Sequence, residues 1–561
     1  MPGTVPELGP SMNEYDVIII GGGSTGTAVA RDCAMRGLKT LMLERDDIAS
    51  ATVGTCAGMI SSGLKYMEEP DIVDMCSQEV VYFKRIAQNI IMKNPILTPM
   101  LEMSDLSSGG NFAEEYSKRA ASRDVPPVLF LTPEDSLKIE PKINPELIAS
   151  MYFEEYFIDP FRLCILQALD ARRRGADIRT YCEVTEMKKT SGNMIEVAFF
   201  NRLTAQKELV TAKVVVNAGG PWADKIAGLL NARLEIRLNK GAHVILDRRV
   251  VNVGIIAKAV DGRMIYLFPH ENTALLGTTA LDSWEDPDTL VASYDEIEYL
   301  LKSIEWVVPS IRQARIIRTM EGARPLVAQW KIPEGKVTRG YQVVDHAPDG
   351  IDGLLSFTGG KLVMCRHMAE SVTDMVCKKL GKDIKCTTHI EPLPGNEASV
   401  DVLALAAQYN ISRHAVERLR ARRGTELGKV LELTREHPEW LSTICACEPV
   451  IEAEIRYAIR EEFPQTLNDL RRRVRLGTGP CQGTLCTFKA AGILADELGL
   501  SGEQFQLEIL DYLSERWKGK RPPMRGEQLS QEEVVQGIYA CVANLDRSDA
   551  HYEPKPWEEA S

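Results

Sequence analysis

Four cysteines near the C-terminus have residue types and a spacing that suit electron transfer. Cys445 and Cys447 form a C-x-C pair, and Cys481 and Cys486 form a C-x4-C pair after a long intervening stretch. Four cysteine thiolates are the usual ligands of a [2Fe–2S] cluster, which carries single electrons. A structural zinc ion also takes four cysteines, although C-x-C is tight for such a site, and structural thiols are a third possibility.

The residues around these cysteines favour the cluster. The segment 477–480 (Gly-Thr-Gly-Pro) directly precedes the second pair, so its backbone N–H groups could point at sulfur. Arg471, Arg472 and Arg473 could offset the negative charge of a thiolate-ligated cluster. We therefore predict that the metal ligands are Cys445, Cys447, Cys481 and Cys486.

A nucleotide-binding pattern occupies the other end of the chain. A β-branched run at 16–20 precedes Gly21-Gly22-Gly23-Ser24-Thr25-Gly26, which fits G-x-G-x-x-G, and helical spacing follows. Gly21 allows the tight turn, Gly23 lets the backbone approach a pyrophosphate, and Gly26 permits close packing of the helix on the strand. A second strand at 40–43 ends at Glu44, which can accept hydrogen bonds from a ribose. Strand, glycines, helix, strand and acid in this order predict a dinucleotide site.

Further strand-to-glycine turns favour FAD over NAD. One lies at 214–220, and another at 353–361 leads into a predicted helix at about 362–380. The N-terminus of that helix could face the flavin pyrimidine and stabilise the anionic reduced ring. The predicted flavin contacts are Gly21, Gly23, Ser24, Thr25, Gly26, Glu44, Arg45, Val184, Ala218, Gly219, Gly359, Gly360, Lys361 and Leu362.

Bulk properties exclude several classes of protein. The formal charge of −13 argues against nucleic acid as a partner, because phosphate binding needs a basic surface. No run is long enough to cross a bilayer, and the N-terminus lacks a signal peptide, so we expect a cytoplasmic protein. Any attachment to the inner face of the membrane would then come through a partner.

From Tyr15 to about Gly526 the chain resembles the flavoprotein large (A) subunit of anaerobic glycerol-3-phosphate dehydrogenase. The resemblance is carried by the nucleotide unit, by the four cysteines, and by Asp159-Pro160-Phe161-Arg162, Asn239-Lys240-Gly241, Gly277-Thr278-Thr279, Gly322-Ala323-Arg324-Pro325 and Thr358-Gly359-Gly360-Lys361-Leu362. It implies oxidation of sn-glycerol 3-phosphate to dihydroxyacetone phosphate by FAD. It also implies a C-terminal [2Fe–2S]-binding helical domain and partner subunits that deliver electrons to membrane quinone.

One loop departs from the family pattern. Thr55 replaces an arginine, Ala57 and Ser61 stand where the family has histidines, and Lys65 replaces the arginine before Tyr66. A tyrosine after the Thr-Gly-Gly-Lys turn is also replaced, by Cys365. These changes remove planar, bidentate anion recognition and keep one flexible point charge, so one wall of the active site has changed.

Four candidate catalytic residues remain. His243 sits where the family places an active-site histidine and could accept a hydroxyl proton, although a core histidine is the simpler alternative. Arg324 could bind a substrate anion or form a structural ion pair. Lys361 could polarise the flavin or the substrate oxygen, because a cation at a helix start opposes the dipole. Lys65 is either a second substrate contact or a plain surface lysine.

The predicted fold class is α/β: a Rossmann-like FAD domain of the D-amino-acid-oxidase and glycerol-3-phosphate-dehydrogenase type, an antiparallel β substrate domain, and C-terminal helical domains. Residues 1–14 form a loose tail. The FAD domain is discontinuous (15–95, 150–235 and 340–382), and inserts at 96–149 and 236–339 form the substrate domain. Helices at 397–440, the cluster domain at 441–500 and a helical cap at 501–540 follow.

The leading functional hypothesis is a flavin dehydrogenase for a small anionic alcohol, most simply glycerol 3-phosphate or a close polyol phosphate. Electrons would leave through the cluster to an electron-accepting partner subunit. One alternative is a related enzyme that oxidises a 2-hydroxy acid or a secondary amine or imino acid, because the Arg/His loop is altered. Another is a non-catalytic electron-transfer subunit.

Overall fold

The N-terminal half of the fold is a parallel sheet covered on both faces. In the computed structural model the described residues are 13–120, 126–545 and 555. The central strands run in the order β17-β18-β10-β1-β2-β7, where β1 (Asn13–Ile20), β2 (Thr40–Leu43), β7 (Asp177–Arg179), β10 (Gln206–Asn217) and β18 (Leu354–Gly359) are parallel and β17 (Tyr341–Asp345) is antiparallel. β8 (Cys182–Lys189) and β9 (Ile195–Asn201) extend β10 as an antiparallel meander.

Alternation along the buried strands determines what covers each face. Val17 and Ile19 point to the core that contains α1 (Ser24–Met35), α5 (Pro160–Arg173) and α8 (Cys365–Lys379). Ile18 and Ile20 point to the opposite core, shared with β8, β9 and α6 (Ala223–Gly228). Because successive side chains of a strand point to opposite faces, a strand covered on both sides reads as a continuous apolar run. The run at 16–20 is such a strand.

The second sheet is mixed and mostly antiparallel. Its order is β15-β11-β14-β13-β12-β4-β6-β3, with β16 beside β11 and β5 beside β6. The strands are β3 (Met59–Ile60), β4 (Ile91–Met100), β5 (Leu129–Leu131), β6 (Ala149–Ile158), β11 (Ile236–Leu246), β12 (Gly254–Lys258), β13 (Met264–His270), β14 (Thr273–Gly277), β15 (Leu281–Asp282) and β16 (Ile316–Val327). Helix α7 (Tyr294–Glu305) covers one face through Ile297, Leu300 and Ile304. The other face carries His243 and Tyr266 and closes over the first sheet.

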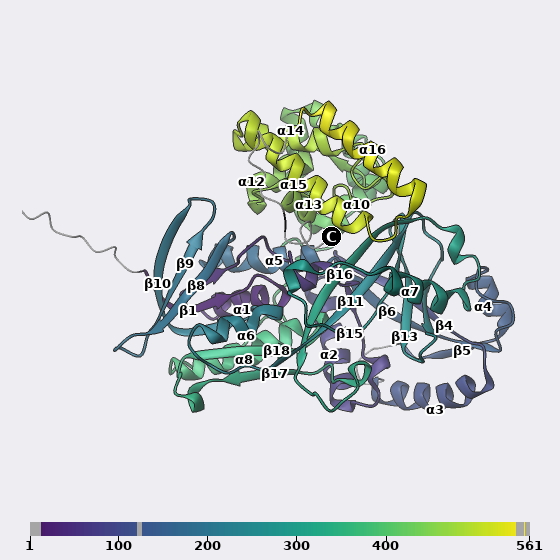
Figure 1. Ribbon diagram of the computed structural model, residues 1–561, viewed down its shortest axis with the longest axis horizontal. Helices are drawn as coiled ribbons and strands as arrows, with labels where there is room; N and C mark the ends of the chain where they lie inside the picture. The colour runs from purple at the N-terminus through teal and green to yellow at the C-terminus, as the bar shows by residue number, and fades with distance from the viewer. Residues whose placement is uncertain (1–12, 121–125, 546–554, 556–561) are drawn as a thin grey trace, which may run out of the picture.

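The C-terminal part is helical and lies to one side of both sheets, in yellow-green in Figure 1. Its elements are α9 (Val402–Tyr409), α10 (Arg413–Arg423), α11 (Leu427–Glu436), the short strands β19 (Thr443–Cys445) and β20 (Val450–Ile451), α12 (Glu452–Glu462), α13 (Leu467–Val474), α14 (Thr487–Leu498), α15 (Gly502–Lys520) and α16 (Gly526–Val542). Among the described residues, none of the helices combines the length and apolarity needed to cross a membrane.

The structure confirms the predicted fold class and differs from two predicted domain ranges. The ranges 15–95 and 150–235 contain β3, the start of β4 and nearly all of β6, and these strands lie in the second sheet. The physical reason is an abrupt crossover: β6 ends at Ile158, and Asp159 already caps the N-terminus of α5 in the first unit. Of the predicted tail, only Asn13 and Glu14 fall within the described residues, and they begin β1. Otherwise the domain limits stay a prediction.

Three further helices are α2 (Pro70–Ile86), α3 (Met103–Ala120) and α4 (Pro133–Ile139). Helix α2 packs in the core of the first sheet through Val80, Phe83 and Ile86. The segment 392–396, between α8 and the helical region, is packed against α2, because Leu393 is buried and its N–H bonds the carbonyl of Ile86. The helical region is thereby fixed to the unit built around the first sheet.

Candidate active site

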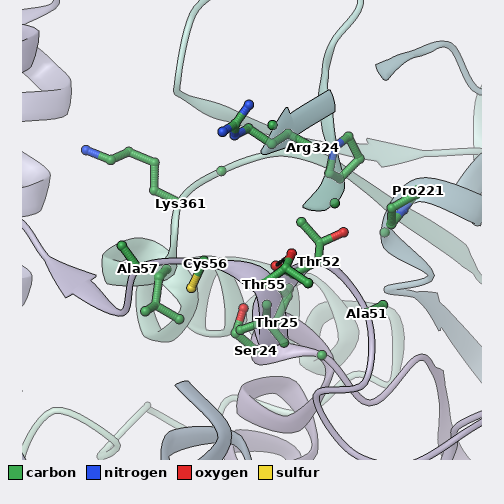
Figure 2. Close-up of a pocket in the computed structure, with 18 of the residues that line it drawn as sticks. Ser24, Thr25, Ala51, Thr52, Thr55, Cys56, Ala57, Pro221, Arg324 and Lys361 are labelled. Carbon is green, nitrogen blue, oxygen red and sulfur yellow. Dashed lines mark hydrogen bonds between the residues drawn. The ribbon is translucent and has the colours of Figure 1, made fainter. Parts of the chain in front are cut away.

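A cavity of about 970 Å³ lies between the two sheets. Its walls include every predicted flavin contact except Gly26, together with His243, Arg324 and Lys361. Figure 2 shows Ser24 and Thr25 on one side of this space, Arg324 and Lys361 on the other, and Thr52, Thr55 and Cys56 between them. The sequence prediction that widely separated segments build one site is consistent with this arrangement.

The glycine turn has no room for a side chain at Gly21 or at Gly26. Gly21 has φ +113°, and a Cβ there would lie 2.4 Å from the carbonyl oxygen of Ala218. A Cβ on Gly26 would lie 1.9 Å from the carbonyl oxygen of Gly21, so Gly26 allows α1 to pack against the strand end. Gly23 is the N-cap of α1 and provides no side-chain cap. The first N–H groups of α1 therefore meet a cavity, which suits a pyrophosphate.

Glu44 and Arg45 occupy the ribose end predicted from sequence. The Glu44 carboxylate accepts hydrogen bonds from the N–H groups of Gly22 (2.5 Å) and Asp46 (2.8 Å). Burial, and then the charge of Asp46, raises the pKa of Glu44 to about 7. Arg45 is held by both oxygens of Asp288, at 3.0 and 2.7 Å, and its guanidinium stacks on Trp222. Glu44 can accept from a ribose diol, whereas Arg45 forms the rim.

His243 is a neutral, buried imidazole on β11. Its side chain lines the cavity and is 3% exposed, and its Nε2 lies 2.7 Å from the Tyr266 hydroxyl. Burial, and then the charge of Arg324, lowers the pKa of His243 to about 3. Its Nδ1 has no hydrogen-bond partner among the described residues. A neutral imidazole with one uncommitted nitrogen is suited to exchange a proton with a ligand.

Two arginines bring positive charge to the same cavity. Arg324 donates to the side chains of Asn239 (2.9 Å) and Thr278 (2.8 Å), and its guanidinium lies over Gly241, where a Cβ would be 2.1 Å away. Among the described residues no carboxylate lies within ion-pair distance of Arg324 or of Arg339, which also lines the cavity. Burial and the neighbouring charge of Arg339 lower the pKa of Arg324 to about 10. Two such guanidinium groups in one cavity form a site for an anion.

Lys361 closes the pocket on the side of α2. Its Nζ lies 3.7 Å from the centre of the Tyr66 ring and 3.6 Å from the Sγ of Cys76. The structure thus gives Lys361 a defined position on the wall of the cavity. Lys65 lies in the short 3-10 turn Leu64–Tyr66, and its side chain lies outside what the structure describes.

The altered loop faces a carboxyl group that the sequence did not single out. Ser61 and Ser62 donate to Glu155 from their hydroxyls (3.1 and 3.0 Å), and the Ser62 N–H donates at 2.8 Å. Glu155 lines the cavity, and burial raises its pKa to about 7. Thr55 and Ala57 also line the cavity, whereas Cys365 is buried at the start of α8 and accepts from Gln167.

Sequence reasoning missed Arg339, Tyr266 and Glu155. Tyr266 and Glu155 sit in strands where the alternation of types could have marked them as facing one side, but no local motif accompanies them. Arg339 precedes Gly340 in a connection between the sheets, and nothing in the sequence marks its direction.

The four cysteines meet as two pairs. Cys486 is a close neighbour of Cys445, and Cys481 is a close neighbour of Cys447. Hydrogen bonding from the Cys486 thiol and from the N–H groups of Gly477 and Glu448 lowers the pKa of Cys445. A Cβ on Gly479 would lie 2.4 Å from the Cβ of Cys447, so the turn before Cys481 fits closely over the first pair. Backbone N–H groups thus point at sulfur as predicted.

The surroundings of the cysteines differ from the prediction in one respect. Among the described residues, no group of three or more His, Cys, Asp or Glu side chains is arranged to hold a metal ion. The expectation for Arg471–Arg473 is partly wrong, because Arg472 and Arg473 are paired with Asp47 of the flavin unit, both at 2.8 Å or less. Arg471 lies over the Tyr512 ring.

Comparisons with known proteins agree with this geometry. Residues 16–366 match the family model "FAD dependent oxidoreductase", and residues 386–505 match "C-terminal domain of alpha-glycerophosphate oxidase". The chain is 35% identical to the large (A) subunit of anaerobic glycerol-3-phosphate dehydrogenase from Escherichia coli K12, over 95% of this chain and 97% of that one. It is 34% identical to the corresponding subunit from Haemophilus influenzae, over 95% and 93%.

A solved structure agrees at the level of the fold. The glycerol-3-phosphate dehydrogenase of Bacillus halodurans, complexed with FAD, superposes with a TM-score of 0.74 at 22% identity, covering 92% of this chain and 97% of that one. Glycine oxidase of Geobacillus kaustophilus superposes over only 68% of this chain, with a TM-score of 0.52. The fold therefore matches that glycerol-3-phosphate dehydrogenase over more of this chain than it matches the glycine oxidase. The chain is an FAD-dependent oxidoreductase and belongs to the family of the large (A) subunit of anaerobic glycerol-3-phosphate dehydrogenase.

Proposed function

We propose that this protein oxidises sn-glycerol 3-phosphate, or a close polyol phosphate, to dihydroxyacetone phosphate with bound FAD. In the proposal its electrons pass through a [2Fe–2S] cluster to a partner subunit. The observation that carries the proposal is the cavity in which two guanidinium groups, with no carboxylate partner among the described residues, lie beside a neutral histidine. An anionic alcohol is the kind of substrate that uses both features.

Arg324 and Arg339 would bind the phosphate. Asn239 and Thr278 hold the Arg324 guanidinium at 2.9 and 2.8 Å, so its orientation is set before substrate arrives. A preorganised planar donor binds a phosphate at two points and fixes the direction of the carbon chain. Lys361, stacked on Tyr66, adds a third positive charge on another wall.

His243 would take the proton of the alcohol. FAD, when bound, supplies the acceptor for the hydride that leaves the same carbon. Tyr266 engages Nε2 of the imidazole and leaves Nδ1 uncommitted among the described residues. The low pKa of His243 comes partly from the charge of Arg324, so a phosphate that offsets this charge raises the basicity of the imidazole. Substrate binding thus prepares its own base.

The cysteine loop fits a [2Fe–2S] cluster. Its four cysteines, Cys445, Cys447, Cys481 and Cys486, lie near one another and match in number and type the usual ligands of such a cluster. Backbone N–H groups of Gly477 and Glu448 directed at Cys445 stabilise a thiolate, as iron ligation requires. When bound, the cluster would carry single electrons.

The proposed acceptor is a protein subunit. Two of the similar proteins carry the name of one lettered subunit of a dehydrogenase, which implies further subunits in those enzymes. We extend that organisation to this chain, with membrane association, if present, provided by the partner. The negatively charged chain gives no support to a nucleic-acid partner.

A panel of anaerobic reductions tests the proposed substrate. We expect glycerol 3-phosphate to bleach the flavin absorbance of oxygen-protected protein at least tenfold faster than lactate, sarcosine or proline at equal concentration, because only the phosphate engages both arginines. Glycerol is the matched control, since it keeps the alcohol and lacks the anion. Faster bleaching by a 2-hydroxy acid or a secondary amine would replace the proposed substrate, and no bleaching by any of them would indicate a non-catalytic subunit.

A further inference from the structure

One arginine joins the loop before Cys481 to the start of α5 and to the second sheet. Arg475 is the C-cap of α13 and has φ +62°, a left-handed conformation that turns the chain from the helix into the loop before Cys481. Thr478 donates to its carbonyl oxygen from both the N–H (3.3 Å) and the hydroxyl (2.8 Å). The backbone of Arg475 is therefore part of the turn that carries Gly477 to sulfur.

The side chain of Arg475 reaches three other segments. Its Nη1 donates to Asp159 at 2.8 Å, its Nη2 lies 3.4 Å from Nδ1 of His270, and its Nε lies 3.7 Å from a carboxylate oxygen of Glu448. Glu448 directly follows Cys447, and its N–H bonds Cys445. One guanidinium thus contacts Asp159 at the start of α5, His270 of the second sheet and Glu448, the residue after Cys447.

Asp159 sits at the point where the chain crosses between the two sheets. Its other oxygen accepts from the N–H groups of Phe161 (2.9 Å) and Arg162 (3.2 Å) and caps α5. The preceding residue, Ile158, donates its N–H to the carbonyl of Gly58 at 2.9 Å, and Gly58 lines the cavity. A continuous route of covalent and hydrogen bonds therefore runs from Gly58 through Asp159 and Arg475 to Gly477, whose N–H meets the sulfur of Cys445.

A second contact holds the same junction. The hairpin between β13 and β14 places Asn272 against the loop, and its side-chain amide donates to the carbonyl oxygen of Cys447 at 2.6 Å. The ion pairs of Arg472 and Arg473 with Asp47 anchor α13 itself to the flavin unit. Buried charged contacts between the units favour one fixed distance rather than a mobile carrier domain.

We propose that Arg475 is the positioning residue that couples the cluster to the flavin. The inference rests on the proposed function: Arg475 holds the loop before Cys481 against Asp159, which follows the strand end that bonds Gly58 of the cavity wall, and its positive charge favours the reduced cluster. The step that it serves moves one electron at a time, out of flavin reduced by substrate and into the oxidised cluster. A protein acceptor then removes each electron, and two such transfers regenerate oxidised FAD.

Three variants of the full chain test this role. Asp159→Asn keeps an oxygen to cap α5 but removes the charge that Arg475 meets, Arg475→Gln removes the guanidinium, and Arg475→Lys keeps the charge without the three-way contact. Arg472→Gln is the matched control, because it lies on the same helix and also pairs across the junction, while Arg473 still holds Asp47. Flavin bleaching by substrate and the EPR signal of the reduced cluster are followed separately under anaerobic conditions.

We expect all four variants to keep FAD, iron and the wild-type rate of flavin bleaching. The rate of electron transfer to the cluster falls on the order of tenfold in Arg475→Gln and in Asp159→Asn. The double variant Asp159→Asn/Arg475→Gln is no slower than Arg475→Gln, because the two substitutions remove the same contact. The midpoint potential of the cluster falls in Arg475→Gln by about 59 mV, which is a tenfold change for one electron. Arg475→Lys keeps the wild-type midpoint potential of the cluster but transfers electrons to the cluster more slowly than the wild type.

Two results with the variants would overturn the inference, and a third concerns the wild type. One is a wild-type rate of electron transfer and a wild-type cluster potential in Arg475→Gln. Another is an equally slow electron transfer in Arg472→Gln, which would mean that any weakening of the junction has the same effect. If Arg475→Gln does not fold, Asp159→Asn and Arg475→Lys decide in its place. Wild-type protein with flavin that bleaches but without a cluster signal would refute the cluster itself, and the inference with it.

Discussion

Arg324→Gln is expected to lower kcat/KM for glycerol 3-phosphate by on the order of 10²–10³-fold, because it removes the buried donor that meets the phosphate. Arg324 has no carboxylate partner among the described residues, and Asn239 and Thr278 orient it toward the cavity. Truncating one member of a buried charge pair costs about 2–5 kcal/mol, which corresponds to this loss of rate. Arg324→Lys keeps the charge but loses the planar pair of donors, so its kcat/KM for glycerol 3-phosphate is expected to lie between those of Arg324→Gln and the wild type.

The control for Arg324 is the substrate rather than a second residue. Slow flavin reduction by glycerol should change little in Arg324→Gln, since glycerol has no anion to bind. The FAD content should stay at the wild-type level, because no flavin contact is altered. An equal loss with glycerol and with glycerol 3-phosphate would show that Arg324 supports the fold of the cavity and does not bind phosphate.

His243→Asn is expected to slow the bleaching of the flavin by substrate by about 10²–10⁴-fold, the usual contribution of a positioned general base. The variant keeps a small polar side chain on β11, so the FAD content should be unchanged. Because burial and Arg324 hold the pKa of His243 at about 3, the imidazole is neutral throughout the neutral range and is ready to accept a proton. Stopped-flow absorbance under anaerobic conditions measures the rate.

Tyr266→Phe is the matched control for His243. The substitution removes the 2.7 Å contact between the Tyr266 hydroxyl and Nε2 and leaves the imidazole in place. The rate of flavin bleaching by substrate should therefore fall only about tenfold. A rate in His243→Asn close to that of the wild type would remove the histidine from the mechanism. A larger loss in Tyr266→Phe than in His243→Asn would make the tyrosine the group that exchanges the proton.

The part of the site that the sequence predicts is the part set by local sterics. Gly21 and Gly26 are identifiable because a Cβ at either position would collide with backbone a few residues away or across one strand. The Glu44 position follows from the length of one strand–helix–strand unit. The second cysteine pair and the Gly477 turn follow in the same way from their own spacing, because Gly477, Cys481 and Cys486 are close together in the sequence.

The rest depends on contacts between distant segments. Arg339 enters the cavity from a connection between sheets, and Arg475 meets Asp159 across more than half of the chain. Nothing near either residue indicates its partner, because register and crossover geometry decide which side chains meet. The expected charge compensation by Arg472 and Arg473 fails for the same reason: Asp47, far along the chain, takes both.

The altered loop shows that the effect of a changed residue depends on the residues that surround it in the fold. Ser61 stands where the family has a histidine, and on sequence alone this removes a polar contact. In the fold Ser61 and Ser62 instead bind Glu155, so the wall keeps an ionisable group of a different kind. The anion site itself lies on another wall, on Arg324 and Arg339.

The most direct test of the account is an anaerobic titration of the purified protein with glycerol 3-phosphate. Complete reduction should consume about 1.5 equivalents per chain, two electrons for FAD and one for the cluster, with loss of flavin absorbance and growth of the EPR signal of a reduced [2Fe–2S] centre. Cys447→Ser should end at about one equivalent without the signal. An end point of one equivalent in the wild type, or no reduction by this substrate, would contradict the central claim that one chain couples a phosphate-recognising flavin site to an iron–sulfur centre.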